Sequence, residues 1–483
     1  MSDVSHGVNA SKTNNGAITP VSVDTGVHFV VGTAPVQMVN GKVNEVIMAS
    51  SYKEAVQALG YSDDWKKYSL CEEIYTAFTL FNSAQVFFVN VLDPKKHKKT
   101  VDETQIDVVD GQIVLPAEAI AGSVEITGKT AGEDYEVFYS DTNCVVEFLK
   151  ETTGKLTVKY DAVDASQVTK SDIIGGYSVS THKTTGLELI NNVFPLYTKV
   201  PDLILCPNWS HDAEVAAVMS AKAENINGLF EGEAILDIDC TAETGATYYT
   251  EVPAWKKQKN FTKRTEVVCF PKVALGDRVF NLSTQLAASM SAVDNAEEYG
   301  GGARGGGGGT PCESASNKGI QADRMVTADG SEVVMDIQQA NYLNENGVVT
   351  ALNFFNGFVS WGNYTACYPA NTDVTDYFYC INRMFKWVAK TLILTYWNYI
   401  DRGIKRRLID AVVQSINDWL ASLATDEKII GGRVEFNESE NSTSQLAAGI
   451  VRFHIYMTPP SPMQKMDFVL EYDLSYLAAL VAA

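Results

Sequence analysis

The stretch Val27-His28-Phe29-Val30-Val31-Gly32 is an apolar run interrupted by a single histidine. A short run without polar alternation is typical of a strand that is buried on both faces. Val86-Phe87-Phe88-Val89-Asn90-Val91-Leu92 has the same character. Between the two runs, Ser51-Tyr52-Lys53-Glu54 and Ser69-Leu70-Cys71-Glu72 match the capping box that opens a helix. The order strand, helix, helix, strand predicts a small α/β unit.

The pattern changes after the basic run from Lys95 to Lys99, which we interpret as a solvated linker. From about residue 101 to 180 short apolar segments such as Ile113-Val114-Leu115 alternate with turn signals such as Asp110-Gly111. Strands of this length and spacing predict a β-sandwich or a small barrel. This β-rich domain is inserted between α/β parts.

The α/β pattern returns from about residue 183. Apolar runs at 203–207, 234–239 and 267–271 alternate with helical patterns at 212–225 and 277–294. This alternation predicts parallel strands joined by crossover helices. The glycine-rich segment 300–309 lacks the Gly-Lys-Ser/Thr ending of a phosphate-binding loop, so its composition predicts a flexible surface loop.

The last third of the chain contains two long helical patterns, at 374–394 and 404–423. Arg402, Lys405 and Arg406 lie near the start of the second pattern. Positive charge at a helix N-terminus opposes the helix dipole. These residues are therefore candidates for contact with a partner, and a plain solvated helix face is the alternative.

The segment from Lys465 onward has apolar residues at every second position, with Asp467, Glu471 and Asp473 on the opposite, acidic face, which predicts a strand with one buried face. The prolines of Thr458-Pro459-Pro460-Ser461-Pro462 set it off from the preceding chain. A lone strand is unstable in water, so this arm needs a partner strand from its own sheet or from a neighbour. Its apolar face consists of Met466, Phe468, Leu470, Tyr472 and Leu474.

The N-terminal end has a similar character. Residues 1–16 are small and polar, and Ile18, Val21 and Val23 follow before the first buried run. An ordinary frayed terminus is the alternative interpretation. Two such arms in one chain favour a building block that lends strands to other copies of itself.

The bulk composition limits the function classes. A length of 483 residues predicts two to four domains, and 46% hydrophobic with 20% charged residues is typical of a globular protein. A net charge of −21 argues against nucleic-acid binding. The sequence shows no apolar run long enough to span a membrane and no secretory signal, so we expect synthesis in the cytoplasm. The eight cysteines show no paired spacing and are expected to be reduced and buried.

A catalytic interpretation rests on His211, which follows a predicted strand, and on Ser289 further along the chain. Ser289 lies inside a predicted helix without the glycine-flanked turn that exposes a nucleophile. Asp237 and Asp239 share one strand face, but no third metal ligand accompanies them. The sequence therefore predicts no enzyme, no cofactor and no metal.

Taken in order, several segments resemble the contractile tail sheath proteins of bacteriophages and phage-derived contractile particles, and the resemblance covers nearly the whole chain. The matching segments are Gly26 to Pro35, Val43-Asn44-Glu45, Ser51 to Glu54, Glu313-Ser314-Ala315-Ser316-Asn317-Lys318, Asn341 to Val348, and Phe468 to Leu474. The glycine run at 300–309 departs from the family pattern.

The resemblance implies a helical sleeve of many copies around an inner tail-tube protein, linked by strand exchange and contracting to drive the tube through a cell envelope. Baseplate and terminator proteins would be further partners, with no nucleic acid and no membrane insertion. The protein would be made in a bacterial host and would belong to a virion tail or a released contractile particle. Arg402, Lys405 and Arg406 would contact the tube. A subtilisin-like serine hydrolase with a β-sandwich accessory domain is the alternative, and a surface adhesin is disfavoured.

The resemblance also implies an α/β multidomain fold with a subtilisin-like parallel-sheet domain. The expected parts are an N-terminal arm (1–25), the first part of an inner α/β domain (26–95), an inserted β-rich domain (96–182), the subtilisin-like α/β domain (183–350), a C-terminal inner domain (351–462) and a C-terminal strand arm (463–483).

Overall fold

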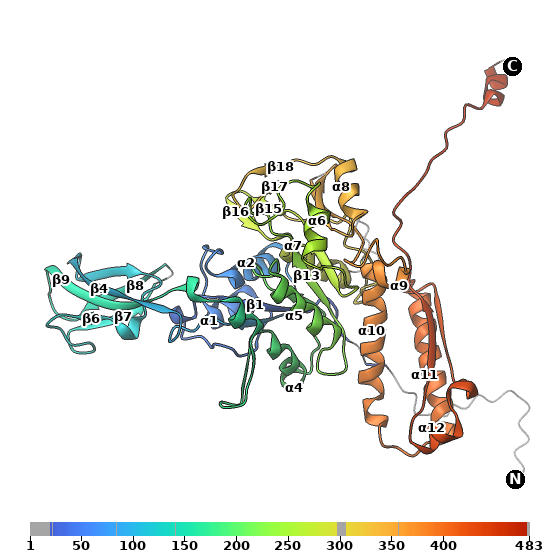
Figure 1. Ribbon diagram of the computed structural model, residues 1–483, viewed down its shortest axis with the longest axis horizontal. Helices are drawn as coiled ribbons and strands as arrows, with labels where there is room; N and C mark the ends of the chain where they lie inside the picture. The colour runs from blue at the N-terminus through green and yellow to red at the C-terminus, as the bar shows by residue number, and fades with distance from the viewer. Residues whose placement is uncertain are drawn as a thin grey trace, which may run out of the picture.

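The computed structural model of the chain describes residues 20–21, 23–83, 85–140, 142–296, 306–355 and 357–480. The molecule is elongated (Figure 1). A β-rich part forms one end, an α/β part forms the middle, and the long helices α10 (Tyr379–Tyr396) and α11 (Arg406–Thr425) form the other end. Beyond these helices the C-terminal segment points away from the body.

A six-stranded sheet forms the middle part, in the order β14-β13-β12-β1-β3-β2. Five of its strands run parallel, and β2 is antiparallel at one edge. All residues of β1, including His28, are buried, as the apolar run predicted. The strands are β1 (His28–Gly32), β2 (Ile47–Ala49), β3 (Val86–Asn90), β12 (Leu203–Leu205), β13 (Glu233–Asp237) and β14 (Glu266–Cys269).

This sheet joins two segments that the sequence analysis assigned to separate domains. β1 pairs with β3 on one side and with β12 on the other. The segments 26–95 and 183–350 therefore share one sheet and one hydrophobic core. The division was wrong because strand pairing brings together runs that lie more than 100 residues apart, across the inserted domain.

Helices cover both faces of the sheet. His28 of β1 contacts Glu73 of α2 at 2.6 Å and the Ala287 carbonyl of α7 at 3.2 Å. On the opposite face, Glu266 of β14 accepts a hydrogen bond from Ser220 of α5 at 2.5 Å. The helices of this part are α1 (Tyr52–Leu59), α2 (Ser69–Tyr75), α3 (Lys170–Ile174), α4 (Val193–Tyr197), α5 (Ala213–Glu224), α6 (Val252–Gln258), α7 (Leu282–Asn295) and α8 (Ile337–Asn344).

The first predicted capping box forms, except that the Glu54 carboxylate binds the N–H of Ser50 instead of that of Ser51. The Ser51 side chain accepts from the Glu54 N–H at the start of α1, and the Glu54 carboxylate accepts from the Ser50 N–H. The second prediction was wrong. Ser69 is itself helical, and the Glu72 carboxylate is buried, where it accepts from Asn281 and Thr284. Burial raises the pKa of Glu72 to about 7.

Short antiparallel pairs complete the α/β part. The predicted helix at 277–294 begins only at Leu282, because residues 278–280 form a strand of one of these pairs. The strands are β10 (Gly176–Ser178) with β11 (Lys183–Thr185), then β16 (Arg278–Phe280), β15 (Lys272–Leu275), β17 (Arg324–Val326) and β18 (Glu332–Val333) in one sheet, and β19 (Thr350–Asn353) with β20 (Phe358–Trp361).

The inserted β-rich part has its own hydrophobic core, enclosed by two three-stranded antiparallel sheets. One sheet has the order β4-β9-β6 and the other β5-β8-β7. The strands are β4 (Lys98–Val108), β5 (Gln112–Pro116), β6 (Glu125–Ile126), β7 (Tyr135–Tyr139), β8 (Asn143–Phe148) and β9 (Gly154–Val163).

The basic run at 95–99 is not a free linker. His97 is buried and its Nδ1 accepts from the Asp93 N–H at 3.0 Å, while Lys98 and Lys99 already belong to β4. The charge pattern predicted solvation of the lysines correctly but could not reveal the buried histidine or the strand that begins within the run.

The C-terminal part is a helical hairpin with a small sheet. α10 and α11 pack around a third hydrophobic core that includes Trp387, Ile416 and Leu420. The remaining elements are α9 (Val374–Tyr377), α12 (Thr443–Ala447), β21 (Gly431–Glu435) and β22 (His454–Thr458), of which the last two form an antiparallel pair.

Lys256 of α6 holds two loops of the middle part together. Its ammonium donates to the carbonyls of Asn346 and Ala366, both at 2.8 Å, and of Tyr368 at 3.2 Å. Burial lowers the pKa of Lys256 to about 8. One side chain therefore satisfies three carbonyls that belong to segments remote from α6 in the sequence.

Replacing Lys256 by Met leaves these carbonyls without their donor. We expect Lys256→Met to lower the free energy of unfolding by about 3 kcal/mol. Because the folded-state pKa of about 8 lies below 10.5, the unfolded chain binds more protons between these values. The stability of the parent protein relative to the variant should therefore rise from about pH 8 toward 10.5 and stay flat below pH 8. Urea denaturation across this range measures both effects, with Lys257→Met on the exposed side of the helix as the control.

Candidate functional site

The root of the N-terminal arm lies along α10. The Val21 N–H donates to the Thr395 hydroxyl at 3.0 Å, and the Trp387 indole N–H donates to the Val23 carbonyl at 3.1 Å. The Lys390 ammonium donates to the Asp24 carbonyl at 2.8 Å. These three contacts attach the chain just before β1 to the C-terminal helical hairpin.

The next residues are attached to the core of the molecule. Asp202 accepts from the N–H groups of Gly26 at 2.9 Å and of Val27 at 2.7 Å. Gly26 has φ +67°, and a Cβ at this position would lie 2.6 Å from the Cα of Ser291 in α7. Only glycine allows this close approach together with this backbone conformation. The arm root is therefore held between α10 and α7.

A cluster of buried charges, which we call the junction cluster, lies where α10 meets the sheet. It contains three carboxylates and three cations: Asp202, Glu233, Asp294, Arg383, Lys386 and Lys390. Arg383 forms a bidentate ion pair with Asp294 and also reaches Asp202 at 3.3 Å. Lys386 contacts Glu233 at 2.7 Å. The Thr25 hydroxyl donates to Asp294 at 2.7 Å, so the arm root belongs to the same network.

The pKa values of the cluster reflect competition between burial and pairing. Burial alone would raise the pKa of Asp202, but Lys390 and Arg383 outweigh burial and lower it. For Asp294 burial prevails and raises the pKa to about 6. Burial lowers the pKa of Lys386 and of Lys390. Removing one partner would leave an uncompensated buried charge, which costs several kcal/mol.

No prediction from the sequence concerns the junction cluster, although a signal for it is present. Arg383, Lys386 and Lys390 occur at i, i+3 and i+7 within a predicted helix, so they share one face. A basic stripe in an otherwise apolar helix face indicates acidic partners. Those partners, Asp202, Glu233 and Asp294, come from distant segments and carry no pattern of their own.

The predicted contact residues of the N-terminal arm differ in their exposure to solvent. Ile18 lies outside the described residues. Val21 is 47% exposed, whereas Val23 is only 9% exposed and lies against its own chain. The prediction of Val23 as an intersubunit contact needs correction, because this position belongs to the root that α10 holds.

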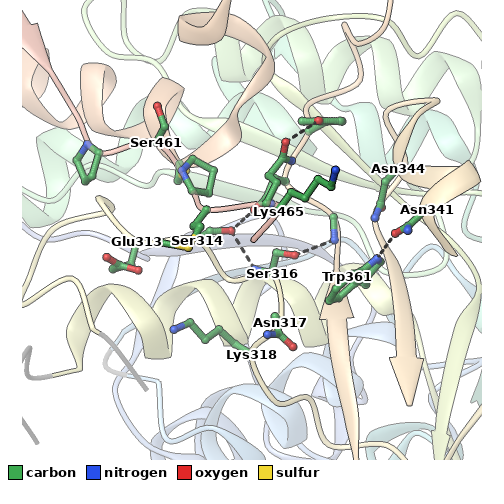
Figure 2. A pocket seen from close by; sticks show the side chains of 18 of the residues that line it. Glu313, Ser314, Ser316, Asn317, Lys318, Asn341, Asn344, Trp361, Ser461 and Lys465 are labelled. Carbon is green, nitrogen blue, oxygen red and sulfur yellow. Dashed lines mark hydrogen bonds between the residues drawn. The ribbon is translucent and has the colours of Figure 1, made fainter. Parts of the chain in front are cut away.

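The root of the C-terminal arm forms one wall of a polar groove of about 700 Å³. Figure 2 shows Ser461 and Lys465 on one side of this groove and Asn341, Asn344 and Trp361 on the other. The Tyr364 hydroxyl donates to Gln464 at 2.9 Å. Past this contact the chain leaves the body.

The predicted C-terminal strand does not form within the single chain. Met466 to Asp473 have no ladder partner, and Leu474–Leu480 is a 3₁₀-helix. Phe468 is 82% and Leu470 93% exposed, and Met466, Tyr472 and Leu474 are also exposed. A lone strand has nothing to satisfy its backbone groups, which is the physical reason for the missing element. The apolar face that the sequence predicted is uncovered in the monomer.

The three basic candidates lie at the tip of the helical hairpin. Arg402 stacks over the Tyr399 ring at 4.4 Å, Lys405 precedes α11, and Arg406 pairs with Asp410 at 2.9 Å. All three are exposed. The structure brings them close together in the chain turn between α10 and α11.

The arrangement does not favour a hydrolase. Ser289 is 2% exposed on α7, and in the described part of the chain no hydrogen bond joins it to His211. Asp237 accepts from Ser210 and from Ser283, so it holds the start of α7 in place. Asp239 accepts from Thr241 and Thr244. Among the residues that the structure describes, no group of three metal-ligating side chains forms a site.

Two further expectations concern cysteines and membranes. All eight cysteines are buried, as predicted. No helix in the described ranges is long and apolar enough to cross a membrane.

The structure is that of a multidomain α/β chain in which the apolar side chains of segment 466–474 are exposed. Comparisons with known proteins find chains of similar sequence and fold. No family model matches the chain. The tail sheath protein of Burkholderia phage BcepMu is 24% identical over 493 residues, 98% of each chain. A putative prophage major tail sheath protein of Pseudomonas aeruginosa strain UCBPP-PA14 is 25% identical and covers 68% of this chain and 78% of its own.

Solved structures show the same fold. The contracted sheath complex of the extracellular contractile injection system PVC superposes with a TM-score of 0.58 at 11% identity, over 99% of both chains. The contracted helical sheath of the anti-feeding prophage gives 0.55 at 10% identity, over 98% of this chain and 100% of the other. The sequence relatives are tail sheath proteins, the family that the sequence motifs resemble, and the solved sheath structures share the fold of this chain.

The junction cluster supplies a test of how the arm root is held. We expect Arg383→Met to lower the free energy of unfolding by about 4 kcal/mol, because Asp294 and Asp202 lose their buried counter-charge. Adding Asp294→Asn should recover part of this loss, since it removes one orphaned charge. Thermal unfolding of the two single variants and the double variant measures the coupling. Arg402→Met at the exposed hairpin tip is the matched control and should change stability by less than about 0.5 kcal/mol.

Proposed function

We propose that this protein is the structural subunit of a contractile tail sheath, in which many copies form a helical sleeve linked by strand exchange through their arms. The observation that carries the proposal is the C-terminal segment 466–474, whose apolar face is uncovered in the monomer. The tail sheath relative that matches 98% of the chain supports it. An apolar face and a row of free backbone groups in one segment call for strand addition to another copy.

The anchored roots explain how such links would carry force. The N-terminal root is bonded to α10 and to the sheet at once, through Asp202 and Lys390. Pulling on the arm would load both parts of the subunit together. The arms would keep neighbouring copies connected while the bodies repack into a contracted arrangement of lower free energy.

The remaining partners follow from this role. An inner tail tube would lie inside the sleeve, and baseplate and terminator proteins would close its ends. Arg402, Lys405 and Arg406 concentrate positive charge at one exposed tip of a chain whose net charge is −21. An acidic tube surface would fit this tip, because complementary charge sets the register of an interface. Synthesis would take place in the bacterial host, before assembly into a tail or a released particle.

The role of the apolar face of segment 466–474 in polymerisation can be tested by comparing substitutions on this face with a substitution on the opposite face. Phe468→Asp combined with Leu470→Asp removes two side chains that strand addition would bury, at a cost of about 3 kcal/mol or more. The protein concentration needed for polymerisation should rise roughly 100-fold. Sedimentation and negative-stain microscopy measure this change. Val469→Asp, on the acidic face of the same segment, is the control and should polymerise like the parent; equal polymerisation by all three proteins contradicts strand exchange.

The basic tip can be tested by co-sedimentation with preformed tubes. Replacing Arg402, Lys405 and Arg406 by Gln should weaken retention of the sheath on the tube roughly tenfold at low salt. The difference should vanish at about 0.5 M salt, where exposed charges are screened. The control replaces Lys99, Lys155 and Lys159 by Gln, an equal charge change on exposed strands of the inserted part. Equal retention of both triple variants would remove these residues from the tube interface.

A further inference from the structure

One outer surface of the inserted part carries an apolar row. The antiparallel register of β5, β8 and β7 places Val114 opposite Val145 and Val145 opposite Phe138, so these three side chains lie side by side across the sheet. Their strand neighbours, among them Ile113 and Val146, point the other way, into the core of the inserted part. Val114 is 57% and Phe138 41% exposed, and Val145 lies between them. The row is therefore an apolar sheet surface that faces water in the single chain.

A pair of glutamates lies next to this row on the same face. Glu136 and Glu147 are register partners on β7 and β8, two residues from Phe138 and Val145. Like charges directly opposite each other on neighbouring strands are unfavourable. The ion pairs of the inserted part join other residues, and within the described ranges none includes either glutamate. A partner that is both apolar and positively charged would relieve both features. We call this surface the insert face; it consists of Val114, Val145, Phe138, Glu136 and Glu147.

The hairpin formed by β10 and β11 has the complementary chemistry. It projects from the body of the molecule beside α4 (Figure 1). Tyr177 is 60% and Val179 76% exposed. His182 lies beside Tyr177, with its Nδ1 3.0 Å from the Tyr177 hydroxyl oxygen, and Lys183 follows. The segment 176–185 contains no Asp or Glu, in a chain whose net charge is −21. The hairpin therefore combines exposed apolar side chains with positive charge.

The base of this hairpin is fixed to the body. Gly175 has φ +66°, and a Cβ at this position would lie 1.9 Å from the Thr185 carbonyl oxygen, so only glycine allows the two strands to approach here. The Gly186 N–H donates to Asn44 Oδ1 at 3.0 Å. Beyond its base, a hairpin of two strands has little stability of its own. The fold thus sets where the hairpin leaves the body, while its apolar side chains stay exposed.

The two surfaces fit one another across two copies of the chain. Both are exposed in the single chain, so neither covers the other. A contact between two different surfaces is heterologous and extends into rings or open helices. We propose that the β10–β11 hairpin of one copy binds the insert face of a second copy, with Tyr177 and Val179 over the apolar row and with His182 and Lys183 beside the two glutamates. This inference rests on the sleeve proposed above and adds to it a contact that does not use the arms.

A charge exchange in the full chain tests this contact. Glu136→Lys with Glu147→Lys reverses the charge of the insert face, and His182→Glu with Lys183→Glu reverses that of the hairpin. Either pair should raise the protein concentration needed for polymerisation roughly tenfold, because like charges then meet. All four substitutions in one chain restore opposite charges, and the concentration should return to within about threefold of the parent value. Sedimentation measures these concentrations.

The matched control for the insert face is Asp102→Lys with Glu103→Lys, an equal charge change at the exposed bulge of β4. This pair should polymerise like the parent. Combined with the two hairpin substitutions, it should leave the tenfold loss uncorrected, because it lies outside the insert face.

Cross-linking locates the contact directly. One chain carries Phe138→Cys and another carries Val179→Cys, while the eight native cysteines are buried. When the two chains are mixed, polymerised and treated with a mild oxidant, a disulfide-linked dimer should form, which electrophoresis without reductant separates from the single chain. Thr104→Cys, at an exposed position of the other sheet, replaces Phe138→Cys in the control and should give no dimer with Val179→Cys.

The possible results separate the inference from the function on which it rests. Polymers that form without rescue by the charge exchange and without the mixed dimer would overturn the inference and leave the sleeve intact. A dimer of two chains that both carry Phe138→Cys would show that two insert faces meet, which also overturns it. A parent chain that does not polymerise would overturn the sleeve and the inference with it. Each cysteine variant changes one exposed side chain, so the cross-linking result stands even if a charge variant fails to fold.

Discussion

Burial of three cations of α10 opposite three carboxylates determines how the C-terminal helices sit on the six-stranded sheet. Charges removed from water are costly unless each has a partner in good geometry. Arg383 meets this demand by binding Asp294 with both terminal nitrogen atoms, and Lys386 does so with Glu233. The helical hairpin therefore has one favourable position relative to the sheet, and any displacement would expose unpaired charge in the interior.

The same interaction ties the N-terminal arm root to the body. Thr25, Gly26 and Val27 donate hydrogen bonds to the carboxylates that hold Arg383. The strand β1, at the centre of the sheet, begins immediately after this root. Within the described residues, Val21 is held by Thr395 near one end and Gln464 is held by Tyr364 near the other.

Two parts of the C-terminal region bear on assembly: the segment 466–474 and the outer edge of β22. Within the described residues, the C-terminal arm and the outer edge of β22 have no strand partner, and each is unfavourable in isolation because backbone groups and apolar surface face water. In the strand exchange proposed above, two different copies would satisfy one another's groups. The Asn417 carboxamide binds both the N–H and the carbonyl of Val434 and so covers part of the β21 edge.

The sequence by itself determined the elements with strong local patterns. These are the buried runs that became β1 and β3, the parallel strands and helices after residue 200, the β-rich insert, the two long helices, and the uncovered apolar face of the C-terminal segment. Periodicity and composition suffice there, because each element's environment is written in its own residues. The tertiary structure alone decided that residues 26–95 and 183–350 share a sheet, that Glu72 is buried rather than a cap, and that Asn417 covers an edge. These features depend on contacts between segments remote in the chain, and a single sequence carries no local record of such contacts.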